Sequence, residues 1–319
     1  MAGKDHRGNH SVTRWLAGAA CLALLIGFGR LALFAAIERE AFVPKPAGVF
    51  TPESFGTPSR QIVFASSQRQ LHASYVQAAD PAAPALMICH GDEENLSDWA
   101  IVQALLYHEG ISSFVFDYSG YGASSGRPSV SNLRQDGLEA YRRFVADTPL
   151  AARRYVLGYS LGSGVLLDIV GFLSPAPSGV VIGAGFATAR SAAVSTGIVP
   201  SWLAPLLPEP WDNEAQVRKL TLPLLLAHSR SDELIPFANA ERLAGAAAGP
   251  HRLVAYNGLV HNAAIEGDQF TRFWAPITAY LRSGQLDPAR AGPAGTSDVD
   301  SVEPGASRHA ASVTPLSSH

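Results

Sequence analysis

Residues 153–168 read RRYVLGYSLGSGVLLD, and the other elements of the chain are interpreted relative to this segment. It opens with apolar and aromatic residues typical of a buried strand, and 165–170 has the composition of a helix. Between them lies Gly158-Tyr159-Ser160-Leu161-Gly162, the G-x-S-x-G pattern of a sharp strand-to-helix turn that lifts a serine hydroxyl above the edge of a sheet. A Cβ at either glycine would collide with a neighbouring strand or helix. The stretch therefore predicts Ser160 as a nucleophile.

A second stretch, Gly122-Ala123-Ser124-Ser125-Gly126, fits the same pattern. It is followed by Arg127-Pro128 and a polar run, through which a helix cannot begin cleanly. We therefore predict a loop here, with Ser124 as a turn serine.

Composition bounds the class of protein. The 319 residues are 47% hydrophobic with a net charge of −3, which fits one large α/β domain and argues against a nucleic-acid partner. The two cysteines, Cys21 and Cys89, lie in apolar stretches and suggest neither a disulfide nor a metal site. No cofactor is predicted.

The N-terminal 40 residues have the pattern of a membrane anchor. A polar start with Lys4, Arg7 and Arg14 precedes 16–37, an apolar run of 22 residues broken only by Arg30. That length crosses a hydrocarbon core of about 30 Å. The excess of basic residues before the run predicts a cytoplasmic N-terminus and an exported catalytic domain.

Two other interpretations of this segment compete. A cleaved secretory signal fits the basic start, but no small-x-small cleavage site precedes Glu38. A lipoprotein signal ending at Cys21 fits less well, because the apolar run lies mostly after that cysteine. Secretion after cleavage thus stays the second hypothesis.

The rest of the chain divides into three parts. Residues 41–59 contain four prolines and no periodicity, which predicts an extended linker. Residues 60–285 begin with a β-hairpin and then alternate strands with helices, which predicts an α/β fold with a mostly parallel sheet and helices on both faces. Residues 286–319 are rich in Pro, Gly, Ser and Ala, which predicts a disordered tail.

A serine hydroxyl needs an adjacent base, and a carboxylate must hold that base in its working tautomer. Around an elbow of this type, the acid and then the base follow the serine in the chain, each at the carboxyl end of a strand. Asp232 follows the apolar strand that ends near residue 227, with Glu233 as the runner-up, and His261 follows the strand at 253–256. These residues are the candidate acid and base.

The site also needs donors for an oxyanion. We expect the backbone N–H groups of Leu161 and Asp92 to supply them. The Asp92 carboxylate would repel an oxyanion, so we expect it to turn away or to accept hydrogen bonds. His90, two residues earlier, is interpreted as structural.

Together these motifs resemble the α/β-hydrolase superfamily, in particular its single-span membrane-anchored hydrolase-domain proteins, related to the serine aminopeptidase and lysophospholipase-like branch. The resemblance covers about 60–283 and rests on five motifs in family order: HG at 90–91, FDYSGYGASSGRPS at 116–129, GYSLG at 158–162, SRSDELIPF at 229–237 and GLVHN at 258–262. It implies the triad Ser160, Asp232 and His261, and esterase, thioesterase or lipid acyl-hydrolase activity. His228-Ser229 stands where the family usually has His-Gly.

The segment 187–211 lies where many such enzymes carry a small cap. Its apolar residues Trp202, Leu206 and Trp211, with Leu203 and Leu207, predict a pocket for an acyl chain. The alternative is ordinary packing of a short helical segment.

The sequence therefore predicts a membrane-tethered serine hydrolase acting on a small-molecule or lipid acyl ester or thioester. An aminopeptidase-type enzyme is the second hypothesis, because Asp92-Glu93-Glu94 could bind a substrate amine. A catalytically inactive, membrane-bound interaction module is the third. The oligomeric state is left open.

Overall fold

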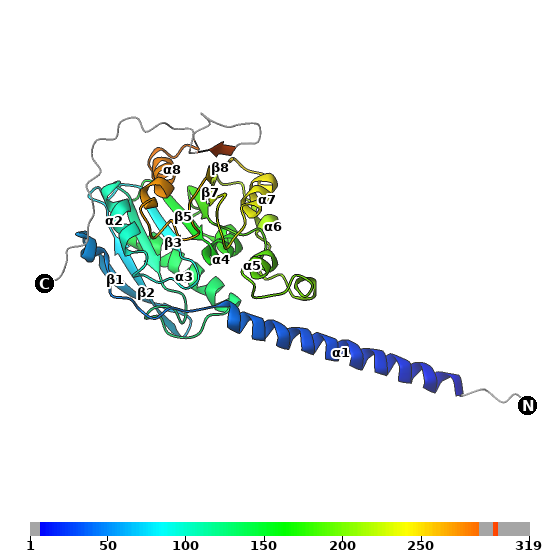
Figure 1. Ribbon diagram of the computed structural model, residues 1–319. Coiled ribbons are helices and arrows are strands. Elements are labelled where there is room, and N and C mark those ends of the chain that lie inside the picture. The colour runs from blue at the N-terminus through cyan, green and yellow to red at the C-terminus, as the bar shows by residue number, and fades with distance from the viewer. Residues whose placement is uncertain (1–6, 287–295, 299–319) are drawn as a thin grey trace, which may run out of the picture.

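The computed structural model describes residues 7–286 and 296–298 (Figure 1). Across these residues the strands form one nine-stranded sheet, in the order β1-β2-β4-β3-β5-β6-β7-β8-β9. The pairs β1/β2 and β2/β4 are antiparallel, and the other neighbouring pairs are parallel. The predicted α/β class with a mostly parallel sheet is confirmed.

The strands are β1 Arg60–Ser66, β2 Arg69–Val76, β3 Ala85–Cys89, β4 Ser112–Phe116, β5 Arg154–Tyr159, β6 Gly179–Gly183, β7 Leu224–Ser229, β8 His251–Tyr256 and β9 Thr296–Asp298. β1 and β2 form the predicted hairpin, with Ser67 in the turn at φ 55°. Strands β3, β4 and β6 are buried along their whole length, as expected of strands covered on both faces.

The helices are α1 Arg7–Ala41, α2 Ala100–His108, α3 Val130–Asp147, α4 Leu161–Ile169, α5 Ala189–Ser195, α6 Asn213–Val217, α7 Ala238–Ala246 and α8 Phe270–Ser283. Of these, α2 and α8 cover one face of the sheet, and α3, α4 and α7 cover the other (Figure 1). Side chains alternate between the faces along β3: Met87 packs in the core under α3 and α4, and Ile88 packs in the core under α2 and α8.

The predicted start of one helix is wrong by a few residues. Ser and Asp are favoured at helix N-caps, so the sequence predicts Ser97-Asp98 as the cap of a helix that runs to His108, but α2 begins at Ala100. Both side chains are used elsewhere: the Ser97 hydroxyl accepts a hydrogen bond from the Phe50 amide at 2.8 Å, and the Asp98 carboxylate binds Lys45 at 2.6 Å. The side chains that could cap the helix are therefore bonded to residues of the segment 41–59 instead.

Helix α1 projects from the domain as a single long rod (Figure 1). Its part Trp15–Ala41 is long and apolar enough to cross a membrane, by length and composition. The predicted cytoplasmic start lies partly in residues 1–6, which are outside the described residues. The segment 41–59 that follows is packed against the domain. Phe42 and Pro52 are buried, and the side-chain amide of Asn95 donates to the Pro46 carbonyl at 2.7 Å.

The predicted disordered tail differs from the structure in one place. Thr296–Asp298 forms β9, which pairs in parallel with β8. The remainder of the tail, 287–295 and 299–319, lies outside the described residues.

Candidate active site

The elbow between β5 and α4 has the strained geometry that the sequence predicts. Ser160 adopts φ 49° and ψ −116°, a conformation that L-residues rarely take. A Cβ on Gly158 would lie 2.5 Å from the Gly162 carbonyl oxygen, and one on Gly162 would lie 2.0 Å from the Cys89 carbonyl oxygen. Glycine is therefore required at both positions, and the tight turn holds the serine hydroxyl above the sheet edge.

The structure brings the three predicted side chains together. The Ser160 Oγ lies 3.0 Å from Nε2 of His261, and Nδ1 of the same ring lies 2.8 Å from Oδ2 and 3.0 Å from Oδ1 of Asp232. The three residues follow β5, β8 and β7, and these parallel strands end at one edge of the sheet. An imidazole held on both sides in this way can accept the serine proton.

The Asp232 carboxylate is buried and fully engaged. It accepts hydrogen bonds from the amides of Leu234 at 3.0 Å and Ile235 at 2.8 Å in addition to the His261 imidazole. Burial acts to raise the pKa of this carboxyl, but hydrogen bonds from His228 and His261 outweigh it and hold the pKa well below its usual range. Asp232 is therefore ionised at neutral pH. The runner-up, Glu233, accepts instead from the main-chain amide of His261, at 3.0 and 3.2 Å.

Two contacts around Ser160, His261 and Asp232 were missed by the sequence analysis. The His228 Nε2 lies 2.8 Å from the Ile235 carbonyl and 3.3 Å from Oδ2 of Asp232, so this buried ring braces the acid loop. The Tyr159 hydroxyl donates to the carbonyl of His261. The only signals in the sequence were the pair His228-Ser229, in which Ser229 departs from the usual family residue, and the position of Tyr159 inside the elbow motif.

The two residues predicted to supply oxyanion donors, Leu161 and Asp92, line the same pocket as Ser160. Leu161 is the first residue of α4, and Asp92 lies in the loop after β3. Within the described residues, neither amide donates to a protein acceptor. The Asp92 carboxylate accepts hydrogen bonds from the Val43 amide, at 3.0 and 3.2 Å, and from the Tyr121 hydroxyl, in line with the expectation that it is hydrogen-bonded.

A buried polar cluster supports the loop after β3. Glu94 accepts from the Gly91 amide at 2.6 Å and from the Trp99 indole at 2.7 Å. Burial raises the pKa of Glu94 to about 7 and lowers the pKa of His90 to about 4. His90 is thus a neutral ring, with Nδ1 2.7 Å from the Gly91 carbonyl, and its geometry fits the predicted structural role.

The second G-x-S-x-G stretch forms a loop. Ser124 is buried, donates to the Asp117 carbonyl at 2.8 Å and accepts from the His72 amide at 2.9 Å. Its hydroxyl is therefore committed to holding the loop against β2. Within the described part of the chain, no group of three or more His, Cys, Asp or Glu side chains is arranged to hold a metal ion.

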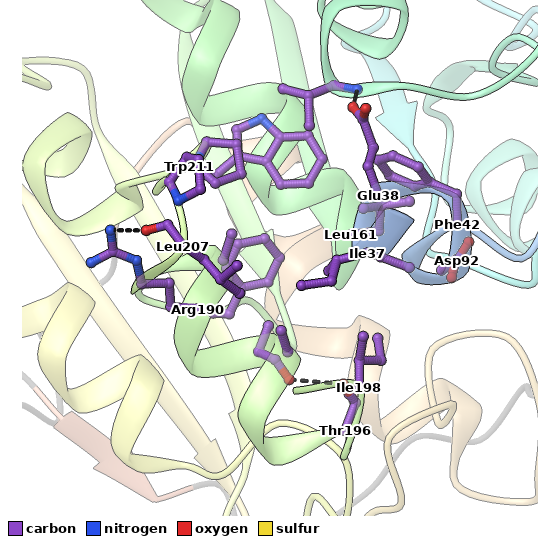
Figure 2. Close-up of a pocket in the computed structure, with 18 of the residues that line it drawn as sticks. Ile37, Glu38, Phe42, Asp92, Leu161, Arg190, Thr196, Ile198, Leu207 and Trp211 are labelled. Carbon is purple, nitrogen blue, oxygen red and sulfur yellow. Dashed lines mark hydrogen bonds between the residues drawn. The ribbon is translucent and has the colours of Figure 1, made fainter. Parts of the chain in front are cut away.

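A cavity of about 170 Å³ opens beside Ser160 (Figure 2). Its walls are mostly apolar and include Leu161, Phe186, Leu207 and Trp211. The figure shows Arg190, Leu207 and Trp211 of the cap segment across from Phe42 and Asp92. The predicted pocket residue Trp211 does line the cavity.

The other two predicted pocket residues do not line it. Trp202 is 74% exposed and Leu206 is 55% exposed, and neither belongs to the cavity wall. The cap segment folds as α5 and a short 3₁₀ helix, Ala204–Leu206. Leu207, which follows that turn, lines the cavity, whereas Leu206 and Trp202 face outward, so the prediction was wrong for Trp202 and Leu206.

The parallel sheet, the elbow after β5 and the arrangement of side chains at the strand ends define a class of fold, and this chain has the α/β-hydrolase fold. The family model described as serine aminopeptidase, S33, matches residues 80–211. The sequence relationship to curated proteins agrees with this placement.

The uncharacterized protein Rv2307c of Mycobacterium tuberculosis is 31% identical over 183 residues, which cover 57% of this chain and 64% of that protein. The uncharacterized protein YfhR of Escherichia coli K12 is 31% identical over 55% of this chain and 62% of its own length. The lysophosphatidylserine lipase ABHD12 of Xenopus tropicalis is 26% identical over 57% of this chain and 51% of its own length. The match therefore spans between half and two thirds of each relative.

Solved structures show the same fold. The esterase Pf2001 of Pyrococcus furiosus superposes with a TM-score of 0.61 at 18% identity, covering 76% of this chain and 98% of that one. The acylaminoacyl peptidase of Pyrococcus horikoshii superposes with a TM-score of 0.60 at 16% identity, covering 72% of this chain and 43% of that one. At such identities the likeness concerns the fold, which carries both ester and peptide chemistry.

Proposed function

We propose that this protein is a serine hydrolase that cleaves carboxylic esters or thioesters through an acyl-enzyme. The observation that carries the proposal is the double contact of His261, with Ser160 on one ring nitrogen and Asp232 on the other. A hydroxyl, a base and a buried, ionised acid in this order are the parts that acyl transfer needs.

In the proposed reaction, His261 takes the Ser160 proton as the oxygen attacks the acyl carbonyl carbon. The amides of Leu161 and Asp92 donate to the oxygen that becomes negatively charged. The protonated imidazole, oriented by Asp232, then gives its proton to the leaving alkoxide or thiolate. Water, deprotonated by the same imidazole, attacks the acyl-enzyme and releases the acid and the free serine.

The pocket supports an acyl substrate over an aminoacyl one. An aminopeptidase would need an anionic wall for the substrate amine, and Asp92-Glu93-Glu94 was the candidate. Glu94 is buried and bonded within its own loop, Glu93 is exposed outside the cavity, and the Asp92 carboxylate is occupied by Val43 and Tyr121. The cavity beside Ser160 is instead mainly hydrocarbon.

We also propose that α1 stays attached as a membrane anchor, with a cytoplasmic N-terminus and an exported catalytic domain. Cleavage before Glu38 would remove Phe34 and Ile37, which line the cavity. The Glu38 carboxylate also accepts a hydrogen bond from the Val130 amide at 2.7 Å, at the first residue of α3. Glu38 would remain after such a cleavage, so it is the loss of Phe34 and Ile37 from the cavity wall that favours an anchor over a cleaved signal.

The test is labelling of the full chain with a fluorophosphonate probe, together with turnover of p-nitrophenyl esters of increasing acyl length. Ser160→Ala is expected to lose labelling and to lower ester turnover by about 10⁴-fold or more. Ser124→Ala, the matched change in the second motif, should keep both. Labelling or turnover that survives Ser160→Ala in folded protein would refute the assignment, and an inactive native chain would favour the interaction module.

A further inference from the structure

One face of the last two turns of α1 belongs to the wall of the cavity beside Ser160. Four residues of this stretch line it, namely Phe34, Ile37, Glu38 and Ala41. They are spaced i, i+3, i+4 and i+7, the spacing of a single helix face, and they are the partly buried positions among otherwise exposed ones. Figure 2 shows Ile37 and Glu38 beside Phe42 at the cavity.

Several contacts fix this face in place. Glu38 accepts from the Val130 amide, Phe42 packs edge-on against Trp211 with ring centroids 6.2 Å apart, and Ile37 packs on the cap cluster of Val199, Ala204 and Leu207. The same helix that is long enough to cross a membrane is therefore bonded to α3 and packed on the cap. It forms part of the substrate chamber as well as a tether.

The position of this face relative to a bilayer follows from helix geometry. The apolar run 16–37 would span about 33 Å at 1.5 Å per residue, close to the hydrocarbon thickness of about 30 Å. Ile37 would then lie at the end of the hydrocarbon layer, and the charged residues Glu38, Arg39 and Glu40 would lie among the headgroups. The cavity wall formed by α1 thus sits at the boundary between acyl chains and headgroups.

The cap presents apolar side chains at the same level. Trp202 and Leu206 are mostly exposed, and they flank Leu203 and Ala204, which pack with Ile37 in one cluster. Ile198, which is 40% exposed, also lines the cavity. Exposed tryptophan and aliphatic side chains next to a membrane span are typical of a surface that sits in the interfacial layer.

We propose that the cavity takes the acyl chain of an amphiphilic ester directly from the bilayer, along the face of α1 formed by Phe34, Ile37, Glu38 and Ala41. This rests on the proposed function and narrows its substrate class to long-chain acyl esters resident in the membrane. The chain leaves the hydrocarbon layer beside Ile37 and enters a cavity whose walls are also apolar. The ester carbonyl reaches Ser160 while the headgroup stays at the surface.

The first experiment fills the entry with a large side chain in the full-length protein, reconstituted in phosphatidylcholine vesicles. Ile37→Trp is compared with Ala36→Trp, which adds the same side chain at an exposed position of the same turn. The readout is kcat/KM for a long-chain monoacylglycerol and for p-nitrophenyl acetate. We expect Ile37→Trp to lower the ratio of long-chain to acetate kcat/KM at least tenfold, and Ala36→Trp to leave both within twofold of the native values.

The second experiment identifies the source of the substrate. The same amount of monoacylglycerol is placed either in the vesicles that hold the protein or in an equal quantity of separate vesicles, and initial rates are compared before the ester exchanges between vesicles. Entry from the bilayer gives turnover at once in the first arrangement and a lag in the second, whereas entry from water gives equal initial rates in both.

The outcomes separate this inference from the proposed function. An unchanged ratio for Ile37→Trp, or equal initial rates from the protein's own vesicles and from separate vesicles, would overturn bilayer entry while Ser160-dependent acetate turnover persists. Acetate turnover that does not depend on Ser160 would overturn the serine hydrolase itself.

Discussion

The carboxylate Oδ2 of Asp232 lies 2.8 Å from Nδ1 of His261, and the adjacent carboxylate of Glu233 binds the main-chain amide of the same histidine. Two acids that are neighbours in the chain thus hold different parts of one residue. The first can orient the imidazole tautomer, and the second fixes the loop that carries it.

This difference gives a matched pair of variants. Asp232→Asn is expected to lower kcat by about 10⁴-fold, because an amide holds the imidazole in the wrong tautomer and cannot stabilise its charged form. Glu233→Gln should stay within about tenfold, since its amide oxygen can still accept from the backbone. The measurement is p-nitrophenyl ester kinetics of both folded variants, and similar losses for the two would contradict the assigned acid.

The tight elbow predicts that replacing Gly162 by alanine destabilises the protein far more than replacing Gly171, a glycine outside the elbow. Gly162→Ala would place a Cβ 2.0 Å from the Cys89 carbonyl oxygen, and backbone cannot move away cheaply. We expect it to cost more than about 4 kcal/mol of unfolding free energy or to prevent folding. Gly171→Ala meets no atom within 4 Å, and its cost should stay within about 1 kcal/mol. Thermal unfolding of the full chain in detergent compares them, and equal stability would contradict the tight elbow.

The bond from Tyr121 to the Asp92 carboxylate is expected to stabilise the loop that we propose supplies an oxyanion amide. Tyr121→Phe leaves the carboxylate with the Val43 amide as partner and should cost about 1–3 kcal/mol, as for hydrogen bonds to charged groups. Tyr107→Phe, a partly buried tyrosine on α2, serves as the control and should change stability by less than about 0.5 kcal/mol. Urea unfolding measures both, and an equally small effect at Tyr121 would argue against this role.

Stability should depend on pH through Glu94. Burial raises the pKa of this carboxyl to about 7 from an ordinary value of 4.5, so between these values the folded state binds more protons than the unfolded state. Its contribution to the free energy of unfolding therefore falls as pH rises from about 4.5 to 7 and is level above that. Relative to the native protein, Glu94→Gln should gain stability across this interval. Urea unfolding at pH 5, 6, 7 and 8 gives the difference, and a difference that does not vary with pH would contradict the buried, protonated acid.

Much of the site could be predicted because it depends on chain order. In a parallel sheet, every strand ends at the same edge, so residues that follow β5, β7 and β8 must converge there whatever the loops do in detail. The requirement for glycine at positions 158 and 162 could also be predicted from the sequence, since only a residue without a Cβ fits so tight a turn. The sequence also limited the acid to two adjacent candidates.

The sequence predicted the cap segment and the apolar N-terminal span, but not which of their side chains face the cavity beside Ser160. Segment 187–211 has no regular apolar period, so nothing local separates Trp211, which lines the cavity, from Trp202 and Leu206, which face outward. The division between Asp232 and Glu233 needed the position of the His261 loop. In the sequence, residues 34–41 form the end of an apolar span. Long-range contacts with α3 and the cap place one face of this segment in the wall of the cavity beside Ser160. Packing between distant segments leaves no signal in the local spacing of residues, so only the tertiary structure reveals it.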